Sequence, residues 1–534
     1  MNRRRGLLAA AVGGAMVATL AACGGGGSGG GATGSGSSFI LGTTETVTAM
    51  DPAGSYDFGS WNMQYNIFQQ LVNIPPGGTT PQGDAAKSCT YQDPKTLTCH
   101  LQPGLTFSNG DKLTSSDVKF SFERNIAIND PNGSAVLLGS ITDASDPNNP
   151  KLASGAIETP DPTTVVFHLN KPDTTFIKVL TTATASIVDE QVFPADKLLP
   201  DNKVIGSGPY ELSQYKAGEQ AVLSANPKYT GAHKPKTDRI FVQYFNDPAP
   251  LKQAIASGQV DIAWRTLSPT DLNSLESNSD VNVIRGKGSE FRYWVFDLKT
   301  QVGKQLAIRQ AVAQLIDRQA IAQKAYDGTV QPSYSIVPPG FAGQKDSFKT
   351  KYGSPSVSKA KALLDKAHIQ TPITIKLGYT PTHYGPNTVD EANELARELN
   401  NSGLFKASVG DAEWEQYQTL YKQGAYDLYI LGWYPDFLDA DNYLTPFLRD
   451  GGFYANGYNN PQVNSLLDQE LGSTNPQERE KTFGQIQDIV AQDVPLVPSW
   501  NGQNVAVAGK DMTGIAQTLD PTYIFRFWLI GKKG

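Results

Sequence analysis

The first 38 residues separate a short leader from the part of the chain that can fold. Three arginines at positions 3–5 precede an apolar run over residues 6–20, and residues 24–38 are almost entirely Gly and Ser. The apolar run is typical of a secretory signal peptide, because a membrane-spanning helix needs about 20 apolar residues. We therefore predict an exported protein with a signal peptide at 1–22, a flexible tether at 23–38 and no spanning helix.

Cys23 lies at the junction of leader and tether. The preceding Leu-Ala-Ala makes a tetrapeptide with it that resembles the bacterial lipobox, in which the Cys is acylated and becomes the new N-terminus. The alternative is a buried Cys beside an ordinary cleavage site. The resemblance implies that Cys23 is a lipid anchor, which would hold the protein on the outer face of the cell membrane, in the extracellular or periplasmic space.

The other two cysteines, Cys89 and Cys99, are ten residues apart. Two short strand-like segments contain them, and the turn-forming sequence Gln-Asp-Pro-Lys at 92–95 lies between the segments. This arrangement predicts a hairpin that brings the two sulfurs together. Because disulfides persist in oxidising compartments, we predict a Cys89–Cys99 bridge, with two free thiols as the alternative.

Composition narrows the classes of protein that fit. Without the three leader arginines, 42 basic residues remain against 52 acidic ones, which argues against a nucleic-acid partner. None of the five His residues has metal-pair spacing or a recognisable Ser partner. The glycine-rich segment 206–210 lacks the Lys of a phosphate loop, and its Pro209 lacks an N–H. We therefore expect a protein that is not an enzyme and uses no cofactor or metal.

About 495 residues follow the tether, enough for two or three domains. Strand and helix patterns alternate along them, which predicts α/β architecture. The expected helices include one opened by a capping box at Thr114 and Asp117, one that begins at Pro250 and a long one over 306–328. Other segments read as helices or strands: helices near 61–72, 363–367, 389–399 and 414–421, and strands at 38–48, 373–379, 426–433 and 496–507.

Several segments, in order, resemble the extracellular solute-binding proteins of family 5, the class of ATP-driven peptide and nickel importers. The clearest is Leu113-Thr-Ser-Ser-Asp-Val-Lys-Phe-Ser-Phe-Glu-Arg124. The others are Met50-Asp51-Pro52-Ala53, Leu101 to Gly110, Val204 to Tyr210 with Asn226 and Tyr229, Ile308-Arg309, Ile316-Asp317-Arg318, Tyr426 to Trp433, and Asp493-Val494-Pro495. We interpret these residues as structural markers, with Gly110 supplying a positive φ and Arg309 or Asp317 tying helices together.

The resemblance implies an α/β fold of the periplasmic-binding-protein type II kind, with two lobes, a hinge and an extra inserted domain. Three domains would then follow the tether and close on a solute by a hinge motion. Their expected boundaries are 39–73, 205–288 and 503–534 for domain I, 74–204 for domain II, and 289–502 for domain III.

The resemblance also indicates ligand contacts. In peptide binders of this family a carboxylate just after the late Gly-Trp strand pairs with the peptide ammonium, and Asp436 stands at that position. The alternative is a surface turn at Pro435 and Asp436. We expect Asp436 to be hydrated in the empty protein. Further candidates for an aromatic wall of the cleft are Trp433, Tyr434, Tyr56, Trp294 and Trp500.

One departure bears on specificity. Dipeptide binders of the family carry an Arg for the substrate carboxylate before a helix of domain III, and residues 379–385 contain none. A longer peptide held through its backbone, or a cationic amine without a carboxylate, fits that absence better than a dipeptide.

We therefore expect a monomeric solute-binding lipoprotein that delivers a peptide or a related cationic small solute to permease subunits driven by separate ATPase subunits. Two alternatives remain at this point. One is an extracellular hydrolase of peptides or glycans, and the other is a surface receptor for signalling peptides.

Overall fold

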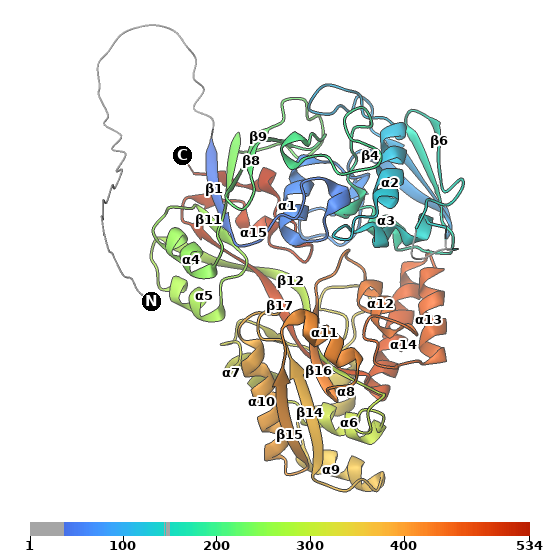
Figure 1. Cartoon of the computed structure of the whole chain (residues 1–534), viewed down its shortest axis with the longest axis vertical. Coiled ribbons are helices and arrows are strands. Elements are labelled where there is room, and N and C mark those ends of the chain that lie inside the picture. The colour runs from blue at the N-terminus through green and yellow to red at the C-terminus, as the bar shows by residue number, and fades with distance from the viewer. Residues whose placement is uncertain (1–36, 144, 146–149, 534) are drawn as a thin grey trace, which may run out of the picture. The chain divides into compact units, whose positions relative to one another are not determined.

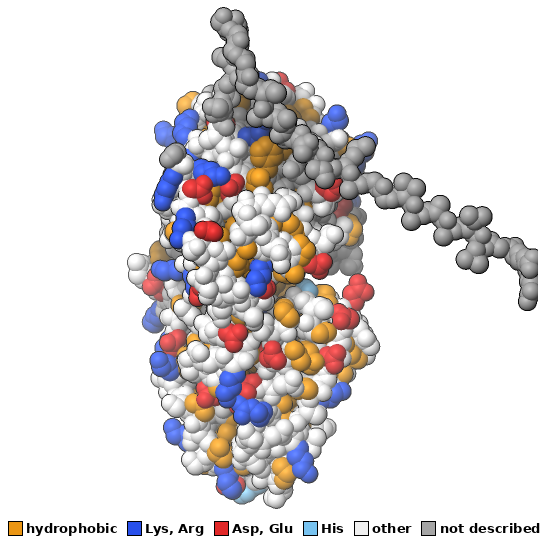
Figure 2. Space-filling view, turned by 90° about the vertical axis from the view of Figure 1, so that its left-hand side faces the viewer, with side chains coloured by type: hydrophobic (Ala, Val, Ile, Leu, Met, Phe, Trp, Pro, Cys, Tyr) orange, Lys and Arg blue, Asp and Glu red, His pale blue; other side chains and the backbone are white. Residues whose placement is uncertain are grey.

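The computed structural model describes residues 37–143, 145 and 150–533. The predicted signal peptide, Cys23 and nearly all of the tether lie outside the described residues. Among the helices that are described, none is both long and apolar enough to cross a bilayer. On the face shown in Figure 2, basic and acidic side chains are interspersed.

One eleven-stranded sheet runs through the fold (Figure 1). Its spatial order is β15 (Phe405–Asp411), β14 (Ile373–Tyr379), β16 (Leu428–Trp433), β12 (Val281–Phe296), β17 (Leu496–Gly509), β11 (Ile262–Trp264), β1 (Ser38–Thr43), β10 (Arg239–Tyr244), β9 (Gln220–Ala225) and β8 (Tyr210–Lys216), with β13 (Gln331–Pro332) paired to β17. A four-stranded sheet has the order β4 (Ala86–Asp93), β5 (Thr96–Leu101), β7 (Thr164–His168) and β6 (Ile157–Asp161). Two small sheets pair β2 (Val72–Asn73) with β3 (Gln82–Gly83) and β18 (Met512–Thr513) with β19 (Gly531–Lys532).

The α-helices of the described residues are α1 (Phe58–Ile67), α2 (Ser115–Ile128), α3 (Phe176–Val179), α4 (Pro248–Ala256), α5 (Pro269–Glu276), α6 (Leu306–Leu315), α7 (Arg318–Lys324), α8 (Ser347–Tyr352), α9 (Val357–Lys366), α10 (Thr388–Asn401), α11 (Trp414–Lys422), α12 (Thr445–Leu448), α13 (Pro461–Leu471), α14 (Pro476–Asp493) and α15 (Ile515–Thr518). The predicted capping box at Thr114 and Asp117 is confirmed at the start of α2. Helix α4 begins two residues before the predicted Pro250.

The single long helix predicted over 306–328 is wrong. Helix α6 ends at Leu315, and α7 begins at Arg318. Asp317 explains the break, because its side chain accepts a hydrogen bond from the backbone N–H of Ala320 at 3.0 Å and so caps a new helix. Arg309 does tie α6 to the end of α14, since its guanidinium donates to the carbonyl oxygens of Asp493 and Val494.

Strands β12 and β17 are the longest in the molecule as described and pair antiparallel along most of their length. Their register shifts between Lys287 and Phe291. Gly288 lies so close to β17 that a Cβ would stand 2.4 Å from the carbonyl oxygen of Gly502, so no side chain fits there. The predicted boundaries 288/289 and 502/503 fall at this irregularity, although the division into three domains stays a prediction.

Three large hydrophobic clusters occupy different parts of the chain. One draws almost entirely on residues 71–187 and covers the four-stranded sheet, with Phe437 added from a distant loop. A second draws on residues 291–500 and Ile74, and a third combines residues 39–68, 188–264 and 506–530. Each cluster buries the apolar faces of its own strands and helices, as separate cores do in a chain of this length.

The structure contains the predicted Cys89–Cys99 disulfide. The two residues lie directly opposite each other in the pairing of β4 with β5, and their Cα atoms are 4.1 Å apart. The bridge therefore closes the hairpin that the sequence predicted.

Two of the motifs noted in the sequence meet in a buried ion pair. The Arg124 guanidinium at the end of the α2 motif donates to both carboxylate oxygens of Asp51, at 2.9 and 2.6 Å, and the two side chains are 2% and 0% exposed. Asp51 also accepts from the backbone N–H groups of Ala53 and Leu199. The pair thus joins the first segment to α2 in a fully hydrogen-bonded arrangement, the condition under which a buried pair is tolerated.

Replacing Arg124 with Met should lower the free energy of unfolding by about 3–5 kcal/mol, because it leaves a buried, unpaired carboxylate. Urea denaturation measures this. The matched control is Lys119→Met, which removes the exposed Lys119–Glu123 pair of the same helix and should cost less than about 1 kcal/mol. Equal losses in the two variants would contradict the structural role of the buried pair.

Candidate functional site

A cavity of about 570 Å³ lies beside the irregular part of β12 and β17. Its walls come from residues 263–269, which include the end of β11 and the segment after it, from Glu290 and Arg292 of β12, from residues 500–507 of β17 and from the loop 382–387 before α10. The volume is in the range of about 300–1,000 Å³ that is usual for small-molecule sites. The cavity is therefore formed by strand ends and loops that are distant in the sequence.

A buried carboxylate positions one wall of this cavity. Glu391 is 0% exposed and accepts four hydrogen bonds. Its donors are Trp294 Nε1 at 3.0 Å, Ser499 Oγ at 2.6 Å, Tyr326 Oη at 2.8 Å and Trp500 Nε1 at 2.7 Å. Tyr326 and Trp500 both line the cavity, so Glu391 holds their rings from behind.

Arg292 lies against this wall. Its guanidinium is 4.0 Å from the ring centre of Tyr384 and 4.9 Å from that of Trp500, and Nη2 donates to Glu290 Oε1 at 2.6 Å. A Cβ on Gly432 would stand 2.2 Å from Arg292 Nη1, so the guanidinium depends on a glycine at that position. The aromatic faces and the carboxylate together compensate for the burial of the charge.

Arg265 forms the opposite part of the lining. Its Nε donates to Glu45 at 2.7 Å, and its guanidinium lies over the rings of Phe58, Tyr434 and Tyr523 at 4.2, 5.0 and 5.4 Å from their centres. Arg265 and the next residue, Thr266, have φ angles of 69° and 67°. Such left-handed conformations are costly for residues with a Cβ and tend to occur where a ligand is bound.

Asp436 lies two residues beyond Tyr434, outside the cavity lining. Tyr56 Oη donates to Oδ1 at 2.5 Å, and Asn442 Nδ2 donates to Oδ2 at 3.2 Å. Tyr56 is 41% exposed, so this contact is open to solvent on one side. Among the described residues, no Lys, Arg or His forms an ion pair with Asp436.

The expectation that Asp436 is hydrated in the empty protein stays a prediction, since the carboxylate is partly buried and its contact with Tyr56 is open to solvent on one side. Burial raises its pKa to about 6, although the hydrogen bonds from Tyr56 and Asn442 oppose the increase. Because the folded protein then binds the proton more tightly than the unfolded chain, the contribution of this group to stability declines as the pH rises from about 4 to about 6. Asp436 is thus ionised at neutral pH at a free-energy cost that a cationic ligand would offset.

The other aromatic candidates divide into three groups. Tyr434 and Trp500 line the cavity. Trp433 and Asp436 meet at Asn442, whose Oδ1 accepts from Trp433 Nε1 at 3.0 Å and from the backbone N–H of Asp436 at 2.9 Å. Trp294 is fully buried and lies behind the wall, where it contacts Glu391.

Sequence reasoning missed four residues of the site: Arg265, Arg292, Glu391 and Tyr523. One local signal was present, because Glu391 stands four and eight residues before the buried Leu395 and Leu399 and so belongs to the buried face of α10. The other three residues reach the cavity because segments that are distant in the sequence lie next to each other in the fold.

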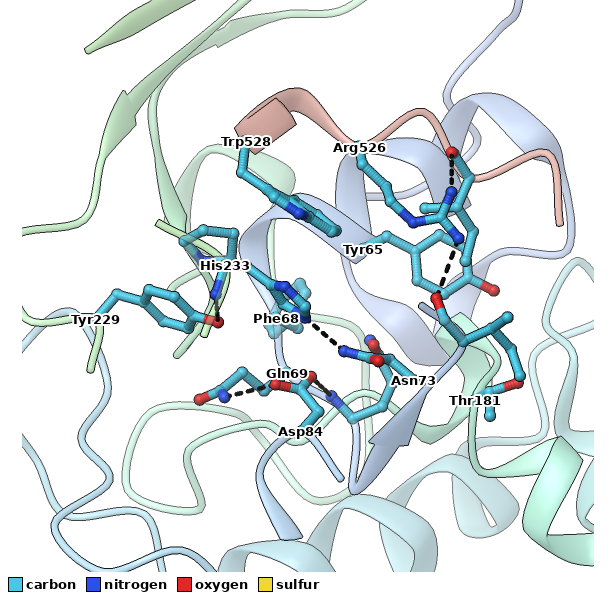
Figure 3. Close-up of a pocket in the computed structure, with 14 residues that line it drawn as sticks. Tyr65, Phe68, Gln69, Asn73, Asp84, Thr181, Tyr229, His233, Arg526 and Trp528 are labelled. Atoms are coloured by element: carbon cyan, nitrogen blue, oxygen red, sulfur yellow. Dashed lines mark hydrogen bonds between the residues drawn. The ribbon is translucent and has the colours of Figure 1, made fainter. Parts of the chain in front are cut away.

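A second cavity is much smaller, at about 20 Å³, which is room for about one water molecule (Figure 3). Asp84 accepts from Gln69 at 2.8 Å on one side of it, and the His233 ring stacks on Trp528 on another. Burial raises the pKa of Asp84 to about 6 and lowers the pKa of His233 to about 4. A cavity of this size is too small for a solute.

Comparison with known proteins identifies the family of this chain. Residues 80–455 match the family described as bacterial extracellular solute-binding proteins, family 5 Middle. The chain belongs to family 5 of the bacterial extracellular solute-binding proteins. This family 5 protein is 27% identical over 490 residues to the probable D,D-dipeptide-binding periplasmic protein DdpA of Escherichia coli K12, with 89% of this chain and 90% of the relative covered.

A further relative and a solved structure are also similar to this chain. The heme-binding protein A of Haemophilus influenzae is 26% identical, with 91% of the family 5 protein and 90% of the relative covered. The structure of HbpA2 from Haemophilus parasuis superimposes with a TM-score of 0.81 at 21% identity and covers 93% of this chain and 100% of that one. The periplasmic-binding-protein fold predicted from the sequence is confirmed.

In the described part of the family 5 protein, no three His, Cys, Asp or Glu side chains are placed to hold a metal ion. The charged and polar side chains that line the large cavity include Arg265, Glu290, Arg292 and Tyr434.

Replacing Glu391 with Gln should lower the free energy of unfolding by about 2–4 kcal/mol, because an amide cannot accept from four donors at once. The fluorescence of Trp294 and Trp500 should change in parallel. Glu415→Gln, an exposed change on α11, is the control. If both variants unfold at the wild-type urea concentration, Glu391 does not organise the wall.

Proposed function

We propose that this family 5 protein is the lipid-anchored receptor of an ATP-driven importer. In this proposal it captures a peptide or a related small solute with a free amino group beside Asp436 and the large cavity, and delivers it to permease subunits. The monomeric state, the lipid at Cys23 and the delivery step belong to the proposal.

One observation carries the ligand class. Asp436 is a partly buried carboxylate that is ionised at neutral pH, lacks a cationic partner among the described residues and stands two residues after the cavity-lining Tyr434. A solute ammonium would supply the missing counter-ion. The relative from Escherichia coli, a probable D,D-dipeptide-binding protein, supports a peptide as the ligand. The relative from Haemophilus influenzae is a heme-binding protein, so similar proteins also bind other solutes.

A peptide-sensing receptor would use the same site, because recognition of the ammonium is common to uptake and sensing. Uptake is favoured here by membership in a family of solute-binding proteins. Loss of peptide import after deletion of the gene distinguishes the two roles.

Replacing Asp436 with Asn should weaken binding of free-amino peptides by at least about tenfold, because truncating one partner of a desolvated charge pair costs about 2–5 kcal/mol. Calorimetry with synthetic peptides measures this, and N-acetylated peptides should bind the wild type as weakly as the free peptides bind the variant. Asp390→Asn, an exposed change on α10, is the matched control and should bind normally.

The same charge pair predicts a pH dependence. Affinity of the wild type should fall about tenfold per unit as the pH drops below about 6, since only the ionised carboxylate pairs with an ammonium. In Asp436→Asn this dependence should disappear. An affinity that is flat between pH 5 and 7, together with equal binding of acetylated peptides, would remove Asp436 from the site.

Replacing Cys23 with Ser should move the protein from the membrane fraction to the soluble fraction, because the proposed acyl chain requires the thiol. Fractionation of cells followed by immunoblotting measures the distribution, with Cys89→Ser as a control that keeps Cys23. Retention of the Cys23 variant in membranes would contradict the lipid anchor.

A further inference from the structure

Two buried carboxyl groups outside the cavity lining lie against each other. Asp441 is 5% exposed, Glu470 near the end of α13 is 0% exposed, and their carboxyl groups lie within hydrogen-bond distance. Within the described part of the chain, one buried oxygen of each, Asp441 Oδ1 and Glu470 Oε1, has no hydrogen-bond donor. Two ionised carboxylates can only accept, so a hydrogen bond between them requires a proton.

The charges next to α14 do not compensate two ionised carboxylates. Arg479 donates to Glu470 Oε2 at 2.7 Å and to both carboxylate oxygens of Asp439 at 2.9 Å. Its guanidinium therefore already serves two carboxylates, and Asp441 makes a third. Three ionised carboxylates and one guanidinium would leave a buried net charge of −2, which is costly in a protein interior.

The remaining charged and titratable groups face the pair from the side of α3. Lys178 adds one positive charge. Asp173 has donors of its own, Ser140 and Thr175. Tyr91 donates to the Asp173 carbonyl oxygen at 2.9 Å, and burial keeps its phenol protonated by raising its pKa. With one proton on the carboxyl pair, the two cations balance the two negative charges that remain beside α14.

The same pair lies next to the segment that carries Asp436. Asp441 belongs to the 3-10 helix Ala440–Tyr443, and its neighbour Asn442 binds Asp436. Asn442 Oδ1 accepts from the backbone N–H of Asp436 at 2.9 Å, and Nδ2 donates to its carboxylate at 3.2 Å. Phe437 packs into the hydrophobic cluster that covers the four-stranded sheet. A displacement of Asp441 would therefore reach Asp436 through one residue.

We propose that Asp441 and Glu470 share one proton, and that this proton holds residues 436–442 where Asp436 can receive a solute ammonium. The second part rests on the proposed function, whereas the shared proton does not. Asp441 and Glu470 are positioning residues that act through Asn442, since neither of them lines the large cavity.

The shared proton makes the position of this segment depend on pH. Burial raises the pKa of Glu470 well above its ordinary value, and the neighbouring Asp441 carboxylate adds to the increase. Because the folded protein binds this proton more tightly than the unfolded chain does, the stabilisation is complete below about pH 4 and is lost as the pH rises through the folded pKa. Above that value two ionised carboxylates repel each other and displace Asp441 together with Asn442.

Glu470→Gln tests the proton, because an amide N–H can donate to Asp441 while the amide oxygen still accepts from Arg479. At neutral pH, the infrared difference spectrum of wild type minus variant should show the C=O band of one protonated carboxyl group. The unfolding equilibrium constant of the wild type, divided by that of the variant, should rise about tenfold per pH unit from about pH 5 until that band disappears. Glu480→Gln, an exposed change on α14, is the matched control and should keep the wild-type band and pH dependence.

Asp441→Asn repeats the test from the other side of the pair, because its amide can donate to Glu470. The carboxyl band should be missing in this variant as well. A wild-type spectrum without a band that both variants lose, or variants that lose stability with rising pH as the wild type does, would overturn the shared proton.

Trp433 reports the position of Asn442 without any ligand, because its indole N–H donates to Asn442 Oδ1 at 3.0 Å. In protein labelled with fluorotryptophan, the fluorine NMR signal of Trp433 should shift as the wild-type carboxyl band disappears, and should stay constant in Glu470→Gln. A Trp433 signal that stays constant up to the alkaline limit of the folded wild type would overturn the positioning role.

Peptide binding separates this inference from the proposed function. Over the range in which the band disappears, synthetic free-amino peptides should bind the wild type about tenfold more weakly per pH unit relative to Glu470→Gln. The peptide ammonium titrates equally with both proteins, so the ratio of affinities removes its effect. A ratio that is constant over this range would overturn the positioning role. A Trp433 shift in a protein that binds no peptide at any pH would contradict the proposed function and leave the shared proton supported.

Discussion

The pairing of β12 with β17 is the constraint on which the site depends. These two strands continue one sheet from β16 on one side to β11 on the other, and their register shifts twice, between Lys287 and Phe291 and between Arg292 and Tyr293. Glu290, Arg292 and Trp500 all lie at or next to these shifts. A change of register alters the direction in which the side chains of a strand point. The irregularity therefore turns polar side chains toward the cavity.

Charge burial is balanced differently in the scaffold and at the site. The Arg124–Asp51 pair and the Glu391 carboxylate are hydrogen-bonded within the protein. They therefore rigidify the fold and need no ligand as a partner. Asp436 accepts hydrogen bonds from Tyr56 and Asn442 but forms no ion pair with any described residue. The proposed ammonium group of a solute would supply the counter-ion that this carboxylate lacks.

Local patterns predicted local features well. The capping box of α2 and the Cys89–Cys99 hairpin depend on residues within ten positions of each other, and both were found as expected. The prediction of one helix over 306–328 was wrong because it rested on the spacing of apolar residues alone. Asp317 caps a new helix within that range. Asp436 could be placed through a family motif, but the arginines could not, since their meeting depends on long-range strand pairing that no local pattern encodes.

The central claim is that a solute with a free amino group binds beside Asp436 and in the large cavity. A crystal structure of the protein purified from its native host, without unfolding, tests this directly. We expect a compound bound in the large cavity whose amino group lies within hydrogen-bond distance of Asp436. A bound compound that lies away from the cavity, or that has no amino group beside Asp436, would contradict the account.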